Sequence, residues 1–475
     1  MNLSRRLSAW LLCAAAAGLF GSPIKVSAAV ETGGILHSLT LERAIGLALT
    51  RNRSLAISAL GPRSAALSVD TARSAFAISA HPEVSINTLA SGRGATTLGL
   101  SASRKFRTGT ELSSRVVREE FQGIDGNQER LVVEVSQPLF RFAGRLVNEE
   151  PIVQARSDLR RARRRLASQK QDLVVDVARE YENILRLQQQ LEADRGSYKR
   201  SETLFKRTSA REKLGRASRI DTLRVDLQRG QAQSRLESDR EQLESTKRAF
   251  AELLGFDPGT SFRLEPTVAL DINVPPLEEA VRIAFDNRLD YAQALEDRVD
   301  SQRGVRIARK GLWPDVRVVA RYEHTYDAAL GGLIDDNRWF LGLSADTDFN
   351  HTRERNALKQ AGIDAESARQ FVEMVQLSIA RELQQRMLAY HRAAADLKIR
   401  ERNLRYAKAR LDLARRLFDI GRGDNFTVTD AEQAFVQAQS DHLAGKSDAS
   451  ITAYELLRTM GTLTEVPDTL KPRRL

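Results

Sequence analysis

The chain of 475 residues contains a single cysteine, Cys13, and after Ala29 it has no apolar run as long as a membrane helix. We expect the segment around Cys13 to be removed, so the mature chain has no disulfide and no thiolate metal site. A membrane helix needs about 20 consecutive apolar residues. If the chain crosses a membrane, strands must do so, because only helices and closed barrels satisfy their backbone hydrogen bonds in lipid.

Sequence motifs of catalytic sites are also absent. The chain has no nucleophile elbow and no H-E-x-x-H motif, and its six histidines lack the spacing of metal ligands. Gly445-Lys446-Ser447 resembles the end of a phosphate-binding loop. However, Ser440 stands where that motif requires glycine, and the segment falls in a predicted helix. We therefore predict that the protein is not an enzyme and that it holds no cofactor and no resident metal.

The first residues have the pattern of a secretory signal peptide. Arg5 and Arg6 precede an apolar run over 7–17, and small residues at 26–29 are suitable for cleavage. The run is too short for a spanning helix. We predict a signal peptide over residues 1–28 and export of the rest of the chain, with an N-terminal anchor that stays in place as the alternative.

The chain is basic, but its charge does not favour nucleic acid as a partner. The formal net charge is +11, and it falls to +8 when Arg5, Arg6 and Lys25 are removed with the signal. Such a surplus is found in nucleic-acid-binding proteins. Here the basic residues are spread along predicted helices with Glu and Asp nearby, and the protein is exported. We expect a solvated helix surface and no nucleic-acid partner.

The sequence repeats itself once along its length. Segments with matching residues occur in the same order in each half, namely 41–48 with 277–284, 177–180 with 379–382, and 215–255 with 421–461. Each half reads helix, strands, long helix, glycine turn, long helix. We predict a first repeat over 29–255 and a second over 277–461, with an inter-repeat linker or equatorial region over 256–276 and a C-terminal tail over 462–475.

Two pairs of long helices are predicted. Residues 152–213 contain no proline and only Gly196, and at about 1.5 Å per residue they could extend roughly 90 Å. A return helix follows over 218–254, and the second half repeats the pattern over 353–420 and 424–460. Helices of this length with apolar stripes and charged surfaces are typical of coiled coils. An ordinary packed helix bundle is the alternative.

The strands alternate between apolar and polar residues. One set reads Val316, Val318, Ala320, Tyr322 and Tyr326; the others read Leu131, Val133 and Val135, and Trp339, Leu341, Leu343 and Ala345. A barrel wall with lipid outside and water inside gives this pattern, as does a half-buried sheet. We expect the helix before each strand region to run to Pro82 or Pro314. A further hairpin over about 97–120 is predicted, and its place in a barrel stays open.

Two strand regions in each repeat give about four wall strands. Four strands cannot close a barrel, and lipid does not tolerate an open edge. The chain is therefore expected to assemble with copies of itself.

These features resemble the TolC-like outer membrane efflux family over essentially the whole mature chain. The motifs that carry the resemblance are Leu39-Thr40-Leu41-Glu42-Arg43-Ala44, Ser136-Gln137-Pro138-Leu139-Phe140, Leu253-Leu254-Gly255, and Gly421 with Asp430-Ala431-Glu432-Gln433-Ala434. The resemblance implies a mainly α fold with β, in which a long α-helical coiled-coil barrel joins a transmembrane β-barrel shared between protomers. It further implies a homotrimer with twelve strands in the outer membrane of a Gram-negative bacterium and a helical tunnel in the periplasm.

The function implied by this resemblance is the channel-tunnel component of a tripartite efflux or type I secretion system. Such a duct is a passive exit for substrates, while an inner-membrane pump supplies the energy and a periplasmic adaptor protein grips the helix tips. The implied adaptor-contacting residues are Leu214, Gly215, Arg216, Ile420, Gly421 and Arg422. The implied aperture residues are Asp430, Thr427, where another aspartate is common, and Asp221, which matches Thr427 in the first repeat. Phe418 and Gly423 stand where the family often has polar residues that lock the closed state.

One alternative of a different class remains at this point. A periplasmic coiled-coil scaffold or adaptor without a barrel would explain the helices and the signal, but not two matched strand regions. The cargo also stays open among drugs, metal ions, proteins and polysaccharides, because the pump and the adaptor select it.

Overall fold

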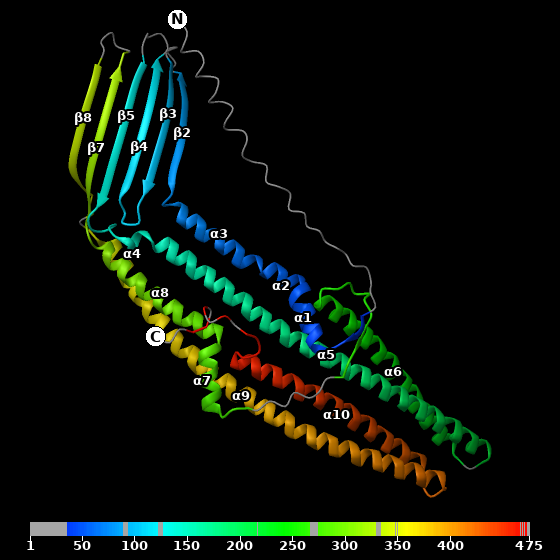
Figure 1. Ribbon diagram of the computed structural model, residues 1–475. Coiled ribbons are helices and arrows are strands. Elements are labelled where there is room, and N and C mark those ends of the chain that lie inside the picture. The colour runs from blue at the N-terminus through cyan, green and yellow to red at the C-terminus, as the bar shows by residue number, and fades with distance from the viewer. Residues whose placement is uncertain are drawn as a thin grey trace.

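The computed structural model describes residues 36–88, 94–121, 127–215, 217–266, 274–328, 334–346, 348, 350–465, 467, 469, 471 and 472. The predicted signal peptide and Arg216 lie outside the described residues, as do parts of the predicted linker and tail. The fold is mainly helical with one large antiparallel sheet. Figure 1 shows the sheet at one end of the molecule and two helical hairpins that extend away from it.

The long helices confirm the sequence prediction closely. The first hairpin is formed by α5 (Glu150–Lys213) and α6 (Arg219–Leu253), and the second by α9 (Thr352–Asp419) and α10 (Asn425–Met460). With 64 and 68 residues, α5 and α9 each extend about 100 Å. Figure 1 shows that both run from the sheet to the far end, where α6 and α10 turn back.

Shorter helices flank the hairpins. They are α1 (Leu41–Arg51), α2 (Arg53–Ser58), α3 (Leu60–Ser74), α4 (Arg145–Asn148), α7 (Leu277–Asn287) and α8 (Leu289–Gly311). The side chain of Asn52 accepts a hydrogen bond from Leu55 N at 2.8 Å and so caps α2. The same side chain donates to Leu253 O at 2.8 Å, which joins the start of α2 to the end of α6.

The large sheet contains six strands in the described residues, in the order β2-β3-β4-β5-β7-β8. They are β2 (Ile78–Thr88), β3 (Gly94–Lys105), β4 (Glu111–Phe121), β5 (Asn127–Pro138), β7 (Asp315–Asp327) and β8 (Ile334–Asp346). The sequence left the place of the further hairpin open, and the structure shows that this hairpin is β3 and β4 and that it joins the same sheet, which therefore has six strands where about four wall strands were expected. The existence of the hairpin, with a turn near Gly109, is confirmed.

The prediction that the first helix runs to Pro82 was also wrong. Helix α3 ends at Ser74, and Pro82 lies inside β2, opposite Leu100 of β3. Proline has no backbone N–H to donate to a neighbouring strand, and within one chain β2 has a neighbouring strand on one side only, where proline is tolerated. In the second half Pro314 does follow the end of α8 directly, as expected.

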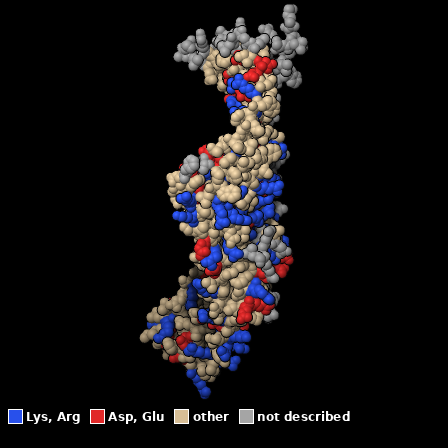
Figure 2. All heavy atoms as spheres, turned by 90° about the vertical axis from the view of Figure 1, so that its left-hand side faces the viewer, with Lys and Arg blue, Asp and Glu red and all other residues tan. Residues whose placement is uncertain are grey.

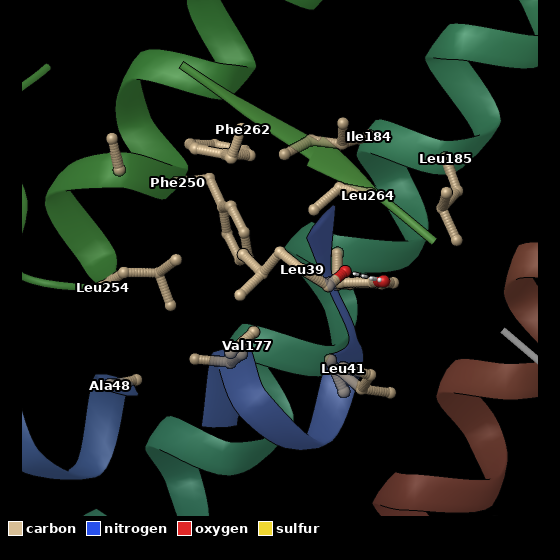
Figure 3. Packing of buried hydrophobic residues seen from close by; sticks show 14 of the residues in the cluster. Leu39, Leu41, Ala48, Val177, Ile184, Leu185, Phe250, Leu254, Phe262 and Leu264 are labelled. Carbon is tan, nitrogen blue, oxygen red and sulfur yellow. Dashed lines mark hydrogen bonds between the residues drawn. The ribbon is translucent and has the colours of Figure 1, made fainter. Parts of the chain in front are cut away.

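The main hydrophobic core lies where the first hairpin meets two short strands. Strand β1 (Leu36–Leu39) pairs in parallel with β6 (Phe262–Leu264), and Leu39, Phe250 and Phe262 pack together between α5 and α6 (Figure 3). Tyr181 of α5 is fully buried, and its hydroxyl lies 2.7 Å from both Leu39 O and Glu265 O, which share its single proton. Burial raises the pKa of this hydroxyl to about 12, so it stays a donor.

Of the helices that the structure describes, none combines the length and the apolar composition that a membrane crossing requires.

A buried aspartate, Asp194 of α5, lies in the interface between α5 and α6. Asp194 is 2 % exposed, and its carboxylate accepts from the side chain of Gln190 at 3.1 Å. Burial, together with a hydrogen bond to Asp239 of α6 and the charge of that carboxyl, raises the pKa of Asp194 to about 6. Between pH 3.8, the ordinary pKa of an aspartate, and about pH 6, Asp194 therefore holds a proton in the folded chain and has lost it in the unfolded chain. Stability falls as the pH rises through this range.

Substitution of Asp194 tests this pH dependence. Asp194→Asn keeps the hydrogen bonds without the buried charge, so it is expected to raise the free energy of unfolding at pH 7.5 by up to about 3 kcal/mol, with no gain at pH 3.5. Thermal unfolding of the purified protein between these pH values measures the effect. Glu192→Gln, on the exposed side of the same helix, is the control. The same pH profile in the Asp194→Asn variant and in the native chain would contradict the assignment.

Candidate functional site: the strand wall and the helix tips

The strand register gives the sheet one apolar face. Residues directly opposite each other in antiparallel strands point to the same side. On one side, apolar residues follow one another across all six strands: Ile78, Val84 and Ile86; Leu98 and Leu100; Leu112 and Val116; Leu131, Val133 and Val135; Val316, Val318 and Tyr322; Trp339, Leu341 and Leu343. Many of them are exposed in the single chain, with Trp339 at 82 % and Leu341 at 77 %. A face of this kind has to be covered by something apolar.

The opposite face is polar and carries paired charges. Its residues include Glu83 and Ser85; Thr97, Ser101 and Ser103; Glu111, Arg115 and Glu119; Arg130 and Glu134; Arg317, Arg321 and Glu323. Ion pairs connect them across the strands: Arg115 with Glu83 at 2.6 Å, Arg321 with Glu134 at 2.6 Å, and Arg130 with Glu323 at 3.6 Å. The two faces thus confirm the alternation predicted from the sequence, with water on the charged side.

Aromatic side chains lie at two levels along the sheet. Phe106, Phe140, Phe142 and Trp313 lie where the sheet meets the helices, and Phe140 contacts Trp313 edge-on at 6.2 Å. At the second level, the ring centroids of Tyr322 and Trp339 lie 4.7 Å apart. Tyr322 lies nine positions after Trp313, which for a tilted strand is roughly 23 Å, close to the apolar band of about 25 Å in membrane barrels. Figure 2 shows a zone with few charges over the part of the sheet nearer the helices, between charged residues at the other end of the sheet and those over the helices.

The helix tips at the far end share one backbone device. Leu214 and Ile420 end α5 and α9, and Gly215 and Gly421 follow with φ of +71° and +78°. No described atom beyond the chain neighbours lies within 4 Å of where a Cβ on either glycine would be. Glycine is therefore favoured here by the positive φ and not by a lack of room for a side chain. Leu214 and Ile420 are 71 % and 66 % exposed. Each tip therefore presents one apolar side chain to its surroundings.

The second tip closes with the hydrogen bonds of a Schellman motif. Arg422 N donates to Leu417 O at 2.8 Å and Gly421 N donates to Phe418 O at 3.1 Å. Arg422 itself is exposed. Phe418 and Gly423 are the two positions where the family often has polar residues that lock the closed state. Here Phe418 is buried in a cluster with Leu411 and Val428, and Gly423 packs closely on Leu417 and Phe418.

Two of the predicted aperture residues take part in the N-terminal caps of the returning helices. Ser218 and Asp221 form a reciprocal capping box at the start of α6, with both bonds at 3.2 Å. At the start of α10, Asp424 accepts from the backbone N–H and the hydroxyl of Thr427 at 2.8 and 2.5 Å. These bonds lower the pKa of Asp424. Asp221 and Thr427 thus have structural roles at matched positions, and a contribution to an aperture stays a prediction for both.

Asp430, the third predicted aperture residue, lies one turn further along α10. Its carboxylate forms an ion pair with Arg410 of α9, and both side chains are about half exposed. The charge of Asp430 is thus balanced in part within the chain. The three predicted aperture positions do not form one cluster of free carboxylates.

The sequence analysis missed the strongest polar contact near the tips. Glu432 of α10 is 4 % exposed, and its carboxylate accepts from Arg200 Nε at 2.8 Å and from Arg415 at 2.7 Å. Arg200 belongs to α5 and Arg415 to α9, so this one carboxylate joins the first hairpin to both helices of the second. A signal was present, because Val428, Glu432 and Val436 recur at the spacing of one buried helix face.

Further contacts join the hairpins beside Glu432. Thr208 donates to Asn425 at 3.3 Å, and both are buried; Arg207 pairs with Asp419 at 2.8 Å. Between these contacts lies a cavity of about 390 Å³ lined by all four long helices. The P-loop-like segment lies elsewhere, inside α10, where Gly445 lets Arg400 of α9 approach closely. That glycine is explained by helix packing and not by a phosphate.

Comparisons with known proteins agree with this architecture. Residues 280–462 match the protein family described as outer membrane efflux protein. No curated protein sequence matches the chain. Among solved structures, the chain is similar to the outer membrane protein VceC of Vibrio cholerae, with 17 % identity, a TM-score of 0.68, and 89 % of this chain and 96 % of that chain covered.

Two further channels have the same fold. The outer membrane channel CmeC of Campylobacter jejuni has 12 % identity and a TM-score of 0.70, with 90 % of this chain and 87 % of that chain covered. The open state of the MtrE outer membrane channel of Neisseria gonorrhoeae has 15 % identity and a TM-score of 0.63, with 89 % of each chain covered. At these identities the likeness shows the fold.

Removal of Glu432 tests the joint between the hairpins. Glu432→Ala leaves Arg200 and Arg415 without their acceptor and is expected to lower the free energy of unfolding by about 3 kcal/mol. It should also speed amide hydrogen exchange over 411–436, which mass spectrometry measures. Asp412→Ala, an exposed acid on α9, is the matched control. Equal stability and exchange in the two variants would show that the Glu432 contacts do not hold the hairpins together.

Proposed function

We propose that the chain is a member of the outer membrane efflux protein family, whose model matches residues 280–462, and that it is the channel-tunnel component of a tripartite efflux or type I secretion system. The observation that carries the proposal is the sheet with one apolar and one charged face, placed at the end of helical hairpins about 100 Å long. The sheet lies in the outer membrane, and the helices lie in the periplasm. The protein acts as a channel and not as an enzyme.

We propose that several copies share one barrel. Within the described sheet β2 and β8 each have a partner on one side only, and an open edge is not tolerated in lipid. Apolar residues seven positions apart on α9, Ile399, Tyr406 and Leu413, are between 45 % and 67 % exposed, which is the pattern of a coiled-coil seam without its partner helix. On α6, Ile220, Leu223 and Leu227 form a second exposed row. Both rows support assembly into a homotrimer, the number that the family resemblance implies.

We also infer that the chain consists of two copies of one unit, over 29–255 and 277–461, joined through 256–276. The close contacts of two glycines support this. A Cβ on Gly255 would meet Arg51 O at 2.3 Å, and one on Gly461 would meet Asn287 Cβ at 3.0 Å. The partners end α1 and α7, the first helices of the two units. Each unit therefore closes its last long helix onto the end of its first helix.

The alternative, a periplasmic scaffold without a barrel, would leave the apolar face in water. Exposed side chains on that face, such as Ile86 at 71 % and Leu343 at 73 %, would then have no apolar surroundings. Burying each such side chain in lipid is worth about 1.5–3 kcal/mol. The family match and this face both favour the duct.

We propose that a periplasmic adaptor protein contacts the tips formed by Leu214, Gly215 and Arg216 and by Ile420, Gly421 and Arg422. The exposed Leu214 and Ile420 support this, because each offers an apolar anchor on a rigid turn. An inner-membrane pump would supply the energy and deliver the substrate through this contact. We further propose that Asp430 lines the aperture, with Thr427 and Asp221 at the rim of the capped helices.

Cell fractionation tests the proposed function. The protein is expected in the outer membrane as an oligomer that resists dissociation in detergent without heating and runs as a monomer after boiling. Liposomes that contain it should conduct ions. The control is the same chain without residues 1–28, which should stay in the cytoplasm. A soluble periplasmic monomer would contradict the proposal.

Divalent-cation block of the conductance tests the role of Asp430. Asp430→Ala is expected to weaken the block in planar bilayers. Arg410→Ala should lower the half-blocking concentration by up to about fivefold, because an exposed ion pair contributes at most about 1 kcal/mol and its loss frees the carboxylate. Asp412→Ala serves as the control for loss of a nearby acid. Unchanged block in Asp430→Ala would remove this residue from the aperture.

A further inference from the structure

The hairpin β3–β4 has the dimensions of a membrane-spanning hairpin. A strand needs about 9–11 residues to cross the bilayer when tilted. Strands β3 and β4 have 12 and 11 residues, and the other strands of the sheet have 11 to 13. Each pairs with its neighbours without a shift in register over its whole length. The hairpin therefore matches the rest of the sheet in length and in pairing.

The hairpin also has the two faces of a membrane wall. Leu98, Leu100 and Val116 lie on the apolar face and are 48 %, 54 % and 48 % exposed in the single chain. On the charged face β3 carries small residues, and Gly99 leaves room beside Glu83. Arg115 of β4 reaches across β3 to pair with Glu83 of β2 at 2.6 Å. This ion pair joins β2 to β4 over β3, on the side where water is expected.

The base of the hairpin is fixed to the junction between sheet and helices. A Cβ on Gly109, whose φ is +95°, would meet Phe142 O at 2.6 Å and the side chain of Asn148 at 2.8 Å. Gly144 N donates to Thr108 O at 2.8 Å, and Thr110 donates to Gln137 of β5. The turn thus packs onto the segment that leads from β5 into α5. A hairpin held in this way cannot leave the sheet without breaking the junction.

Strand directions allow the sheet to continue into another copy. Neighbouring strands are antiparallel at every step from β2 to β8, so β2 and β8 run in opposite directions. Strand β8 of one copy can therefore pair antiparallel with β2 of the next. An added hairpin brings two strands and leaves these directions unchanged. The barrel can thus be widened by a hairpin without any change at its edges.

We propose that all six strands lie in the membrane wall, so that the partner at each sheet edge is a second copy of this chain. The inference rests on the proposed function for the number of copies. Three copies then form an 18-stranded barrel about 36 Å across between backbones, whereas twelve strands would give about 24 Å. A barrel of this width is not filled by its own side chains. The constriction on cargo then lies at the helix tips, and the wall is a wide aqueous exit.

Cysteine pairs in the native outer membrane identify the neighbour of each strand. The only natural cysteine, Cys13, is replaced by serine for this purpose. Val116→Cys with Leu131→Cys places thiols on opposite positions of β4 and β5. Ile86→Cys with Leu131→Cys reports instead on a β2–β5 contact, which exists only if β3–β4 is outside the wall. Val84→Cys combined in turn with a cysteine at Trp339, Leu341 or Leu343 reports on contact between β2 and β8 of different copies.

The products distinguish the proposals. We expect a β4–β5 link within the chain, no β2–β5 link, and a ladder of covalent dimers and trimers from the β2–β8 pairs. Within one chain β2 and β8 lie five strands apart, about 24 Å, so a short thiol cross-linker joins them only between copies. A β2–β5 link would overturn the six-stranded wall and leave the duct intact. No link between copies at any of the three positions would overturn the shared barrel and with it the proposed function.

Discussion

A strand in lipid cannot leave its backbone N–H and C=O groups unpaired, and this constraint determines the rest of the protein. In the described sheet the four inner strands have a partner strand on each side, whereas β2 and β8 have one partner each. Its apolar face needs lipid, and its charged face, with Arg321 and Glu134 paired at 2.6 Å, needs water. We propose that one arrangement meets all three needs, namely a barrel closed by further copies of the chain. The oligomer is therefore a requirement of the sheet and not an addition to it.

In the proposed duct, the helices satisfy their backbone groups in a different way from the strands. Their surfaces are in water, so their backbone groups are satisfied within each helix, and the contacts between hairpins determine how the far end is held. There, Glu432 binds Arg200 and Arg415 at once and thereby joins α5, α9 and α10. Removing Glu432 from this contact is costly because Arg200 and Arg415, which are only partly exposed, both lose their acceptor. Asp194, by contrast, lowers the stability of the fold at neutral pH, because there its buried carboxyl is charged.

Local signals in the sequence predicted the helical part well. Gly215 and Gly421 marked the tips because only glycine adopts their positive φ without strain, and Ser218 and Asp424 stand at the N-caps of α6 and α10. The sheet was less predictable. Alternation gave the faces of β5, β7 and β8 correctly, but the number of strands depends on which distant segments pair. Pro82 was misread because β2, which has only one partner strand within the chain, tolerates proline. Glu432 was missed because Arg200 comes from α5, far away in the sequence, and the sequence does not show that the two hairpins meet there.

The central claim is that strands of several copies form one membrane wall. Electron cryo-microscopy of the full-length protein in lipid nanodiscs, reconstructed without imposed symmetry, tests it most directly. The account predicts a single closed barrel in which β8 of each copy is hydrogen-bonded to β2 of the next, with all six strands of each copy in the lipid layer. A barrel closed by the strands of one copy, or a sheet lying outside the lipid, would contradict it.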